Sequence, residues 1–408
     1  MHKIYLHTPG IVSSLGSGIA QHFHILSQQT PSPLISEDNP FYDPDFNLKQ
    51  GTFGKITCPL LELPESTPAH MVCRSNQITY HALMQIDEQI QQVIAQYGRQ
   101  RVAVVVGTST AGIDTIIPYF KQAYLNNKHD DYLNQSQLYF SSPQDYVREL
   151  YGLEGLGYGI STACTSGARA IMAGARLLLA NLCDAVIVGG VDTLSPLTIK
   201  GFESLSVLSP QVLNPFSTNR QGTNIGEGAA LFVLTRQALN DQAQELLGYG
   251  ASSDAYHMSS PHPEGLGAKL AMEQALALAR LEPSSIGWVN LHGTGTRHND
   301  SMEALAVSQV LGTQVFCTST KPYTAHTLGA AGAIEAAIAW AFISPDLNPT
   351  GVLPAQLWDG QPDPDIPQLN ITQADSYWPQ ARRIALSNSF AFGGNNAVLI
   401  LGQRDDHN

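Results

Sequence analysis

Cys164 is the side chain of this 408-residue sequence best placed for covalent chemistry. It stands in the run GISTACTSG (159–167), where small residues surround the thiol and a helical pattern over 166–180 begins directly after it. A thiol at a helix N-terminus feels the positive end of the helix dipole, which lowers its pKa and favours the reactive thiolate. The position is therefore compatible with a nucleophile. Taken alone, such a cysteine is more often a buried structural thiol, and this is the only interpretation for Cys58, Cys73, Cys183 and Cys317.

A second group of polar residues follows the apolar run 289–291. His292 opens the sequence HGTGTRHNDSME (292–303), at the end of a predicted strand, where α/β sheets place their ligand sites. Thr294 and Thr296 offer hydroxyls to a polar ligand. Asp300 and Glu303 have the spacing of a capping box, so helix capping is favoured for both. The repeat lacks the GxxxxGK[ST] spacing of a phosphate loop.

The third group lies in KPYTAHTLGAAGAIE (321–335), which again leaves a predicted strand and enters an Ala-rich helical pattern over 329–343. Lys321 and His326, each taken alone, are more often solvated or simply hydrogen-bonded side chains than catalytic ones. Glu335 lies within the apolar helical pattern, and a buried carboxylate needs a partner, for which Lys321 is the candidate. The loop FGG (392–394) can present backbone N–H groups to an oxyanion, with Phe392 as a gate.

Short apolar runs alternate with helical patterns along the chain. The strand candidates are 102–106, 185–188, 289–291, 315–318 and 397–401, and the helical patterns are 166–180, 268–280, 300–311 and 329–343. Strands that are apolar throughout predict a sheet covered by helical layers. Two similar α/β halves are expected: 1–245 with the cysteine, and 246–408 with the two histidines, the lysine and the FGG loop. The stretch 346–365 is predicted to be a long surface connection.

Composition narrows the functional classes. With 21 Lys+Arg and 34 Asp+Glu, the formal net charge of −13 disfavours a dedicated nucleic-acid binder. Charged residues make up 13%, against about 25% in an average protein, which predicts a large core or a broad subunit contact. Five cysteines without CxxC spacing fit neither a disulfide framework nor a metal site. No secretory signal and no apolar helix long enough to span a membrane are expected, so the predicted location is the cytoplasm.

Taken together and in this chain order, Cys164, His292, Lys321, His326 and the FGG loop resemble the β-ketoacyl-[acyl-carrier-protein] synthases of the elongating kind. The resemblance extends to GGVD (189–192), to 209–216, to GEGAA (226–230) and to SDAYHMSSP (253–261), and so covers nearly the whole chain. It implies the thiolase-like fold, an α/β architecture of five layers in the order αβαβα, built from two similar halves.

The resemblance also implies a reaction. An acyl group moves from the phosphopantetheine thiol of an acyl carrier protein to Cys164, and malonyl-carrier protein then loses CO₂. His292 and His326, neutral and protonated at Nε2, donate hydrogen bonds to the enolate, which attacks the acyl-Cys164 carbonyl. Backbone N–H groups of Cys164 and Phe392 hold the oxyanion. The chain itself is expected to bind no cofactor.

Other residues receive roles from the same resemblance. Lys321 orients the surroundings of the second histidine and pairs with Glu335, while Asp300 and Glu303 match acidic positions of the family's network. The residues matched to binding are Thr294 and Thr296 for the pantetheine arm, His257 and Ser259 near the acyl and malonyl site, Phe202 and Phe392 in the acyl pocket, and Arg74, Lys121 and Lys128 on the carrier-protein docking surface.

Thr110 departs from the pattern of fatty-acid enzymes. It falls near the far end of the acyl tunnel, where an aliphatic residue or glycine is usual, and hydroxyls there suit an aromatic or polyunsaturated chain better than a saturated one. Together with Asn395-Asn396, where Thr-Asn is usual, Thr110 inclines the interpretation to the ketosynthases of bacterial aryl-polyene clusters. The aryl-polyene ketosynthases pair with a chain-length-factor homologue that lacks the cysteine. A housekeeping fatty-acid enzyme is the alternative interpretation. The dimer is therefore expected to be either a heterodimer with such a homologue or a homodimer.

Two further readings share the fold, a non-elongating partner of the chain-length-factor type and a malonyl decarboxylase. Cys164 together with both histidines argues against the partner that lacks a nucleophile. A thiolase would carry a second cysteine in place of one histidine, and a cysteine hydrolase would use one histidine with an Asn or Asp.

Overall fold

The computed structural model describes residues 3–28, 30–38, 50–114, 124–125 and 135–404. Within them, one large sheet has the strand order β14-β13-β12-β15-β16-β11-β1-β10-β8-β6-β7. Its strands are β14 Asn370–Ile371, β13 Phe316–Thr318, β12 Trp288–Asn290, β15 Ile384–Ala391, β16 Asn395–Gly402, β11 Gln244–Ser253, β1 Tyr5–Leu6, β10 Gly228–Thr235, β8 Ala185–Asp192, β6 Val102–Gly107 and β7 Gly157–Ile160, with β2 Gly10–Ser13 and β3 Gly16–Ser17 beside β10. A small second sheet contains β4 Ile35–Asp38, β5 Gln50–Gly54 and β9 Ile225–Gly226.

The α-helices of the same residues are α1 Ile19–Ser27, α2 Arg74–Met84, α3 Asp87–Tyr97, α5 Ser142–Tyr151, α6 Ser166–Leu179, α7 Pro196–Ser204, α8 Leu266–Ala279, α9 Arg297–Val310, α10 Lys321–Thr324 and α11 Ala331–Ile343. The predicted helices over 166–180, 268–280 and 329–343 correspond to α6, α8 and α11. The remaining predicted helix, 300–311, corresponds to α9, but its predicted start at Asp300 is wrong. The helix begins three residues earlier, at Arg297, with Thr296 in the N-cap position.

The strand β1 joins two parts of the large sheet, because it pairs antiparallel with β10 on one side and with β11 on the other. One part contains β10, β8, β6 and β7, and the other contains β11, β16, β15, β12, β13 and β14. The expected division at residue 245 falls inside β11 and stays a prediction.

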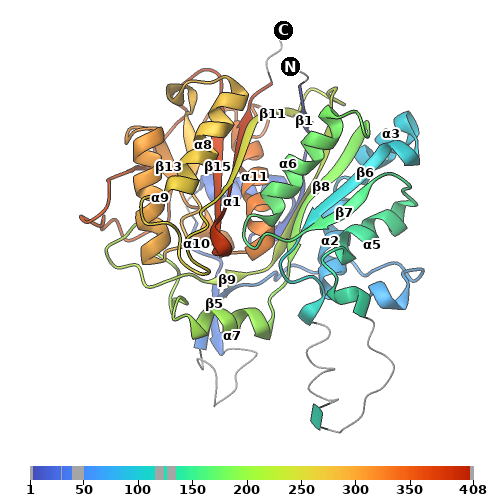
Figure 1. The fold of residues 1–408 in the computed structure, drawn as a ribbon, viewed down its shortest axis with the longest axis horizontal. Coiled ribbons are helices and arrows are strands. Elements are labelled where there is room, and N and C mark those ends of the chain that lie inside the picture. Colours follow the sequence, from blue (N-terminus) through green and yellow to red (C-terminus); the bar gives the residue numbers. More distant parts are fainter. Residues whose placement is uncertain (1–2, 29, 39–49, 115–123, 126–134, 405–408) are drawn as a thin grey trace.

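The two parts of the sheet enclose a central helical layer (Figure 1). The helices α6 and α11 pack against each other, and each contacts strands of both parts. On the outer faces, α2, α3 and α5 pack against β10, β8, β6 and β7, while α8 packs against β11 and β16 and α9 against α8. The result is the helix–sheet–helix–sheet–helix stacking of a thiolase-like α/β fold.

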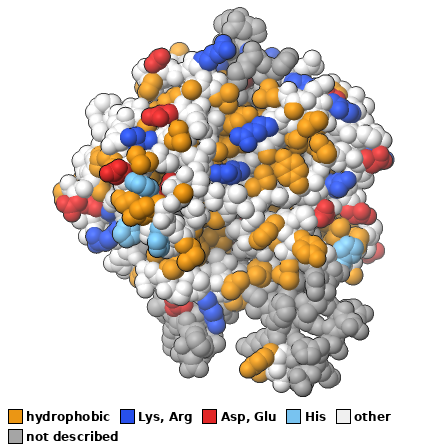
Figure 2. All heavy atoms as spheres, viewed as in Figure 1, with side chains coloured by type: hydrophobic (Ala, Val, Ile, Leu, Met, Phe, Trp, Pro, Cys, Tyr) orange, Lys and Arg blue, Asp and Glu red, His pale blue; other side chains and the backbone are white. Residues whose placement is uncertain are grey.

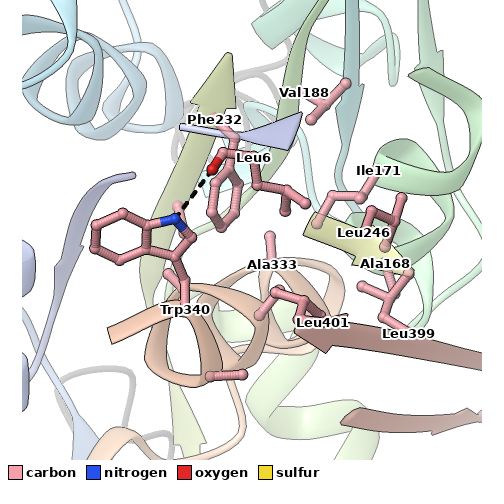
Figure 3. Close-up of a cluster of buried hydrophobic side chains, with 14 of the residues drawn as sticks. Leu6, Ala168, Ile171, Val188, Phe232, Leu246, Ala333, Trp340, Leu399 and Leu401 are labelled. Carbon is pink, nitrogen blue, oxygen red and sulfur yellow. Dashed lines mark hydrogen bonds between the residues drawn. The ribbon is translucent and has the colours of Figure 1, made fainter. Parts of the chain in front are cut away.

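Side chains that alternate along each strand belong to different hydrophobic clusters on the two faces of the sheet. In β6, Ala103 and Val105 belong to the central cluster, whereas Val102, Val104 and Val106 belong to the cluster beneath α2 and α3. Side chains of successive strand residues point to opposite faces, so a strand buried on both sides must be apolar throughout. The central cluster also holds the apolar helix α11, whose Trp340 donates its indole N–H to the carbonyl of Leu6 at 3.0 Å (Figure 3).

Three long strands, β10, β11 and β15, are missing from the strands predicted from sequence. In β11 the reason is its glycines, which weaken a β pattern. A Cβ at Gly250 would lie 1.9 Å from the carbonyl oxygen of Ala271, and one at Gly248 would lie 2.3 Å from that of Ala275. The glycines therefore let α8 pack directly on the strand.

The reactive residues follow parallel strands. The strands β7, β6 and β8 run parallel, and so do β15, β12 and β13. Parallel strands end at the same edge of a sheet, where α/β proteins bind ligands. The chain reaches Cys164 after β7, His292 after β12, His326 after β13 and Phe392 after β15. No helix in the described ranges is long and apolar enough to cross a membrane.

Candidate active site

Cys164 lies on a tight connection between β7 and α6. Its side chain is buried, and the residue before it, Ala163, has φ 52°. Ala325, directly before His326, has φ 55°, and Leu328 has φ 53°. Non-glycine residues in this left-handed region are strained, and such residues cluster at functional sites because the surrounding structure holds them there. Both reactive side chains are thus presented by backbone that the fold holds in a strained conformation.

The structure brings Cys164, His292 and His326 together from three distant segments. His326 Nε2 lies 3.0 Å from Cys164 Sγ. The centroids of the two imidazole rings are 5.2 Å apart, with the ring planes nearly perpendicular. One ligand atom of each of the three residues lies within 4.8 Å of the others. A substrate carbonyl can therefore reach the sulfur and both rings at once.

Burial raises the pKa of the Cys164 thiol to about 12, which overturns the expectation of a resting thiolate. The positive charge of Lys321 and the backbone N–H groups of Phe392 and Cys164 act in the opposite direction but do not outweigh the lost hydration. The thiol is therefore protonated at rest, and it must pass its proton to a neighbour as it attacks. His326 Nε2 is the ring nitrogen in contact with it.

His292 is held by its partners in one tautomer. Lys321 Nζ lies 3.4 Å from His292 Nδ1 and forms the predicted ion pair with Glu335. An ammonium can only donate, so Nδ1 accepts and the ring proton sits on Nε2. Burial, with the charge of Lys321 as a further cause, lowers the pKa of His292 well below its usual value, so the ring is neutral at pH 7. His292 is therefore a fixed neutral hydrogen-bond donor.

His326 differs at its second nitrogen. Its backbone is fixed, because its N–H donates to Asn224 O at 2.8 Å and its carbonyl accepts from Gly226 N at 3.0 Å. Nδ1, however, has no hydrogen-bond partner among the described residues. Burial lowers the pKa of this ring too. A neutral imidazole without a fixed tautomer can accept a proton at Nε2 or donate one from it.

Asp300 and Glu303 stabilise loops and do not cap α9, contrary to the preference drawn from their spacing. Glu303 accepts from the backbone N–H groups of His292 and Gly293, both at 2.7 Å, and from the side-chain amide of Asn388 at 3.0 Å. Asp300 accepts from Phe216 N at 2.9 Å and Gly295 N at 3.2 Å. Burial raises the pKa of Asp300 to about 6 and that of Glu303 to about 7. Both carboxylates thus fix the loop that carries His292.

A pocket enclosing about 660 Å³, open solvent at its mouth included, leads to the three reactive side chains. Phe202 and Phe392 stack in its wall, with centroids 5.4 Å apart and planes 22° from parallel. Thr294 and Thr296, whose hydroxyls lie 3.0 Å apart, also line the pocket, as does Ser259. The lining therefore offers aromatic surface for an acyl chain and hydroxyls for an amide-rich arm.

Some residues matched by resemblance lie elsewhere. Thr110 does not line this pocket; its hydroxyl is donated to Asp192 at 2.8 Å. That hydroxyl is therefore already engaged, and the place of Thr110 at the far end of an acyl tunnel stays a prediction. His257 is exposed and accepts from the backbone N–H groups of Ser259 and Ser260. The Arg74 guanidinium is held by Glu227 at 2.8 and 2.5 Å, and Lys121 and Lys128 lie outside the described residues.

The pocket also has lining residues that received no site role from the sequence, among them Asp254, Asn396 and Thr223. Asn396 donates its amide to Asp254 at 2.7 Å, and the N–H of Asp254 donates to the carbonyl of Gly394 at 2.8 Å. These contacts tie the FGG loop to the start of the run DAYHMSSP. The signal was present, since both segments belong to the motifs quoted for the resemblance.

Cys164, His292 and His326 are also potential metal ligands by residue type. The Lys321 ammonium lies 3.4 Å from His292 Nδ1, and its positive charge opposes a divalent cation at this cluster. The expectation that no metal is used stays a prediction.

Comparisons with known proteins agree with this geometry. The family model for the N-terminal domain of β-ketoacyl synthases matches residues 80–240, and that for the C-terminal domain matches 243–350. The chain is 31% identical over 396 residues to nodulation protein E of Rhizobium leguminosarum bv. trifolii, covering 91% of both chains. It is 37% identical over 269 residues to 3-oxoacyl-[acyl-carrier-protein] synthase 2 of Vibrio harveyi, covering 61% of this chain and 62% of that one.

A solved structure is similar over the full length. A ketosynthase of Xenorhabdus doucetiae (ApeO), determined in complex with its chain length factor (ApeC), superimposes with a TM-score of 0.90 at 39% identity and covers 98% of each chain. The fold is that of the thiolase-like ketosynthases. The chain belongs to the β-ketoacyl synthase family.

Proposed function

We propose that this enzyme joins an acyl group held on Cys164 to the two-carbon unit of malonyl-[acyl-carrier-protein], with loss of CO₂, giving a 3-oxoacyl-[acyl-carrier-protein]. This is the decarboxylative Claisen condensation of the β-ketoacyl synthases. The observation that carries it is the convergence of one thiol and two neutral imidazoles in one pocket.

Acyl transfer comes first. Cys164 Sγ attacks the carbonyl carbon of the acyl thioester while its proton moves to Nε2 of His326. The backbone N–H groups of Cys164 and Phe392, which both point at Sγ, stabilise the oxyanion. Collapse of the tetrahedral intermediate breaks the C–S bond to the pantetheine sulfur, which takes the proton back and leaves as a free thiol.

Decarboxylation and condensation follow. As malonyl loses CO₂, negative charge develops on its thioester oxygen. His292 donates from Nε2, and His326 donates beside it once its ring proton has exchanged through solvent from Nδ1 to Nε2. The carbanion attacks the acyl-Cys164 carbonyl, the C–S bond breaks, and the departing sulfur takes up a proton from solvent. Two neutral donors suit a developing anion because neither must lose a proton to stabilise it.

Replacement of the sulfur tests this assignment. Cys164→Gln removes the nucleophile and keeps the histidines, so we expect malonyl-carrier protein to be decarboxylated while condensation falls below detection. Iodoacetamide followed by peptide mass spectrometry should label Cys164 in the unmodified protein. Condensation by the Cys164→Gln variant would exclude the proposal, and loss of both activities in a folded variant would contradict the separate role of the histidines.

We further propose that the partner in the dimer is a chain-length-factor homologue. The Xenorhabdus ketosynthase was solved with such a partner, and its identity to this chain is 39%. The edge strand β7 pairs only with β6 within the described sheet, and Tyr139, Phe140, Leu156 and Tyr158 are exposed on or near it. Figure 2 shows hydrophobic side chains gathered on this face over α6 and its neighbouring strands. An open, apolar strand edge is a surface that another chain can cover.

Native mass spectrometry of the chain expressed alone and with a neighbouring ketosynthase-like homologue tests the pairing. A heterodimer that condenses malonyl units, with an inactive chain alone, is expected. A stable, active homodimer would contradict the pairing.

The acyl group is proposed to be an aryl starter of the aryl-polyene kind. This assignment is supported by the similarity to ApeO, the Xenorhabdus ketosynthase determined in complex with its chain length factor. Parallel assays with 4-hydroxybenzoyl- and hexanoyl-carrier protein decide it, and efficient extension of hexanoyl alone would overturn it.

Three further expectations stay proposals: a cofactor-free reaction, a cytoplasmic location, and carrier-protein docking at Arg74, Lys121 and Lys128. The five free cysteines support a reducing compartment.

A further inference from the structure

Asp192 is a buried acid that the reaction above does not use. It ends β8, is fully buried, and has no cationic partner among the described residues. Its two oxygens accept from six donor groups. Five belong to the loop after β6: the hydroxyls of Thr108, Ser109 and Thr110 and the backbone N–H groups of Ser109 and Thr110. The sixth is the backbone N–H of Gly329, at 2.5 Å.

The Gly329 contact joins the two halves of the molecule. Gly329 follows His326 by three residues, whereas Asp192 belongs to the sheet part that presents Cys164. A Cβ at Gly329 would lie 2.7 Å from Asp192 Oδ2 and 2.8 Å from Ser109 N. A Cβ at Gly167, on the first turn of α6, would lie 2.9 Å from the carbonyl oxygen of Gly329. The segment that carries His326 is therefore seated directly on the helix that begins beside Cys164.

The charge of Asp192 also acts on the sulfur. Backbone N–H groups face both carboxylate oxygens and can only donate, which favours the ionised form. Burial raises the pKa of Asp192 above its usual value, and the hydrogen bonds from Ser109, Thr108 and Thr110 lower it only in part. The carboxylate in turn raises the pKa of Cys164. It is thus an anion close enough to oppose formation of a thiolate.

We propose that Asp192 is a positioning residue for the Cys164–His326 pair: it anchors the His326 segment, through Gly329, on the helix that begins beside Cys164. Its negative charge adds to the burial that holds the thiol protonated. The inference rests on the proposed function only in taking Cys164 as the nucleophile. It gives the loop after β6 a role in organising the reactive pair.

Two rates on the same thiol test the proposal. For Asp192→Asn we expect acyl transfer to Cys164 to slow at least tenfold with the KM of the acyl donor unchanged. Alkylation of Cys164 by iodoacetamide at pH 8 should become about tenfold faster, because loss of a nearby negative charge lowers the thiol pKa by about one unit. Alkylation needs no carrier protein, so it reports on Asp192 even if the condensation assay shows that the proposed function is wrong.

Two further variants separate charge from packing. Gly329→Ala displaces the Gly329 contact and keeps the charge, so acyl transfer should slow while alkylation does not accelerate. Asp184→Asn, directly before the first residue of β8, breaks the ion pairs of Asp184 with Arg101 and Arg236 and should lower the melting temperature without changing either rate.

An Asp192→Asn chain alkylated at the unmodified rate, or a Gly329→Ala chain alkylated as fast as Asp192→Asn, overturns the proposal. If Asp192→Asn does not fold, Gly329→Ala still decides the anchoring role: an unchanged acyl-transfer rate excludes it.

Discussion

The segments that carry His292 and His326 follow neighbouring parallel strands, yet they hold their imidazoles differently. Around His292 the loop is clamped by Glu303, and Lys321 fixes the ring tautomer from behind. Around His326 the backbone is clamped, but Nδ1 has no partner among the described residues and Nε2 touches the sulfur. The His292 ring is therefore held in one tautomer as a hydrogen-bond donor, whereas the His326 ring can accept or donate a proton at Nε2. The difference indicates a division of labour between decarboxylation and acyl transfer.

Replacement of each histidine should separate the two steps. In a Cys164→Gln background we expect His292→Ala to slow malonyl decarboxylation about 10²–10³-fold, the usual effect of losing one preorganised donor to an oxyanion. In the unmodified background His292→Ala should keep acyl transfer within about threefold, whereas His326→Ala should lose both steps. Single-turnover acylation and CO₂ release measure them. Equal loss of acyl transfer in both variants would remove the division of labour.

The pH dependence of the thiol provides the next test. Because burial raises the pKa of Cys164 to about 12, the thiolate fraction should increase about tenfold per pH unit across the stable range. Alkylation by iodoacetamide should therefore accelerate about a hundredfold between pH 7 and pH 9, without a plateau. Acyl transfer, in which His326 accepts the proton, should change much less. A plateau in alkylation near pH 7 would restore the thiolate expected from the helix dipole alone.

Lys321→Met removes the group that fixes His292. We expect decarboxylation to fall about tenfold because the His292 ring loses its tautomer control. The free energy of unfolding should fall by about 3–5 kcal/mol, because Glu335 is left as an unpaired buried acid. Urea unfolding measures this loss, and Lys321→Met/Glu335→Gln should recover part of the stability but none of the decarboxylation. Full recovery of activity in the double variant would show that Lys321 acts on Glu335 alone.

The sequence was most informative where chemistry depends on local order. Cys164 was found because small residues surround it and a helix begins directly after it, and His292 and His326 because each follows a predicted strand. The Lys321–Glu335 pair was expected because a buried acid needs a cation. Properties set by distant segments were not accessible. The protonation of Cys164 depends on its burial, and the partner of Gly329 lies 137 residues away. The helix dipole argument considers only neighbouring residues, whereas the pKa of Cys164 is raised mainly by the loss of hydration on burial.

Thr110 shows the same limit and leads to the smallest expected effect. Its position matched the far end of an acyl tunnel, but the direction of a hydroxyl depends on the acceptor that the fold supplies, here Asp192. Thr110→Val keeps the shape and removes one of six donors to that carboxylate. We expect the ratio of kcat/KM for aryl and saturated primers to change by less than about twofold, with a stability loss of about 1 kcal/mol. Because valine also adds apolar surface, a large shift of preference toward hexanoyl-carrier protein would mean that Thr110 does face the acyl chain in the acylated enzyme.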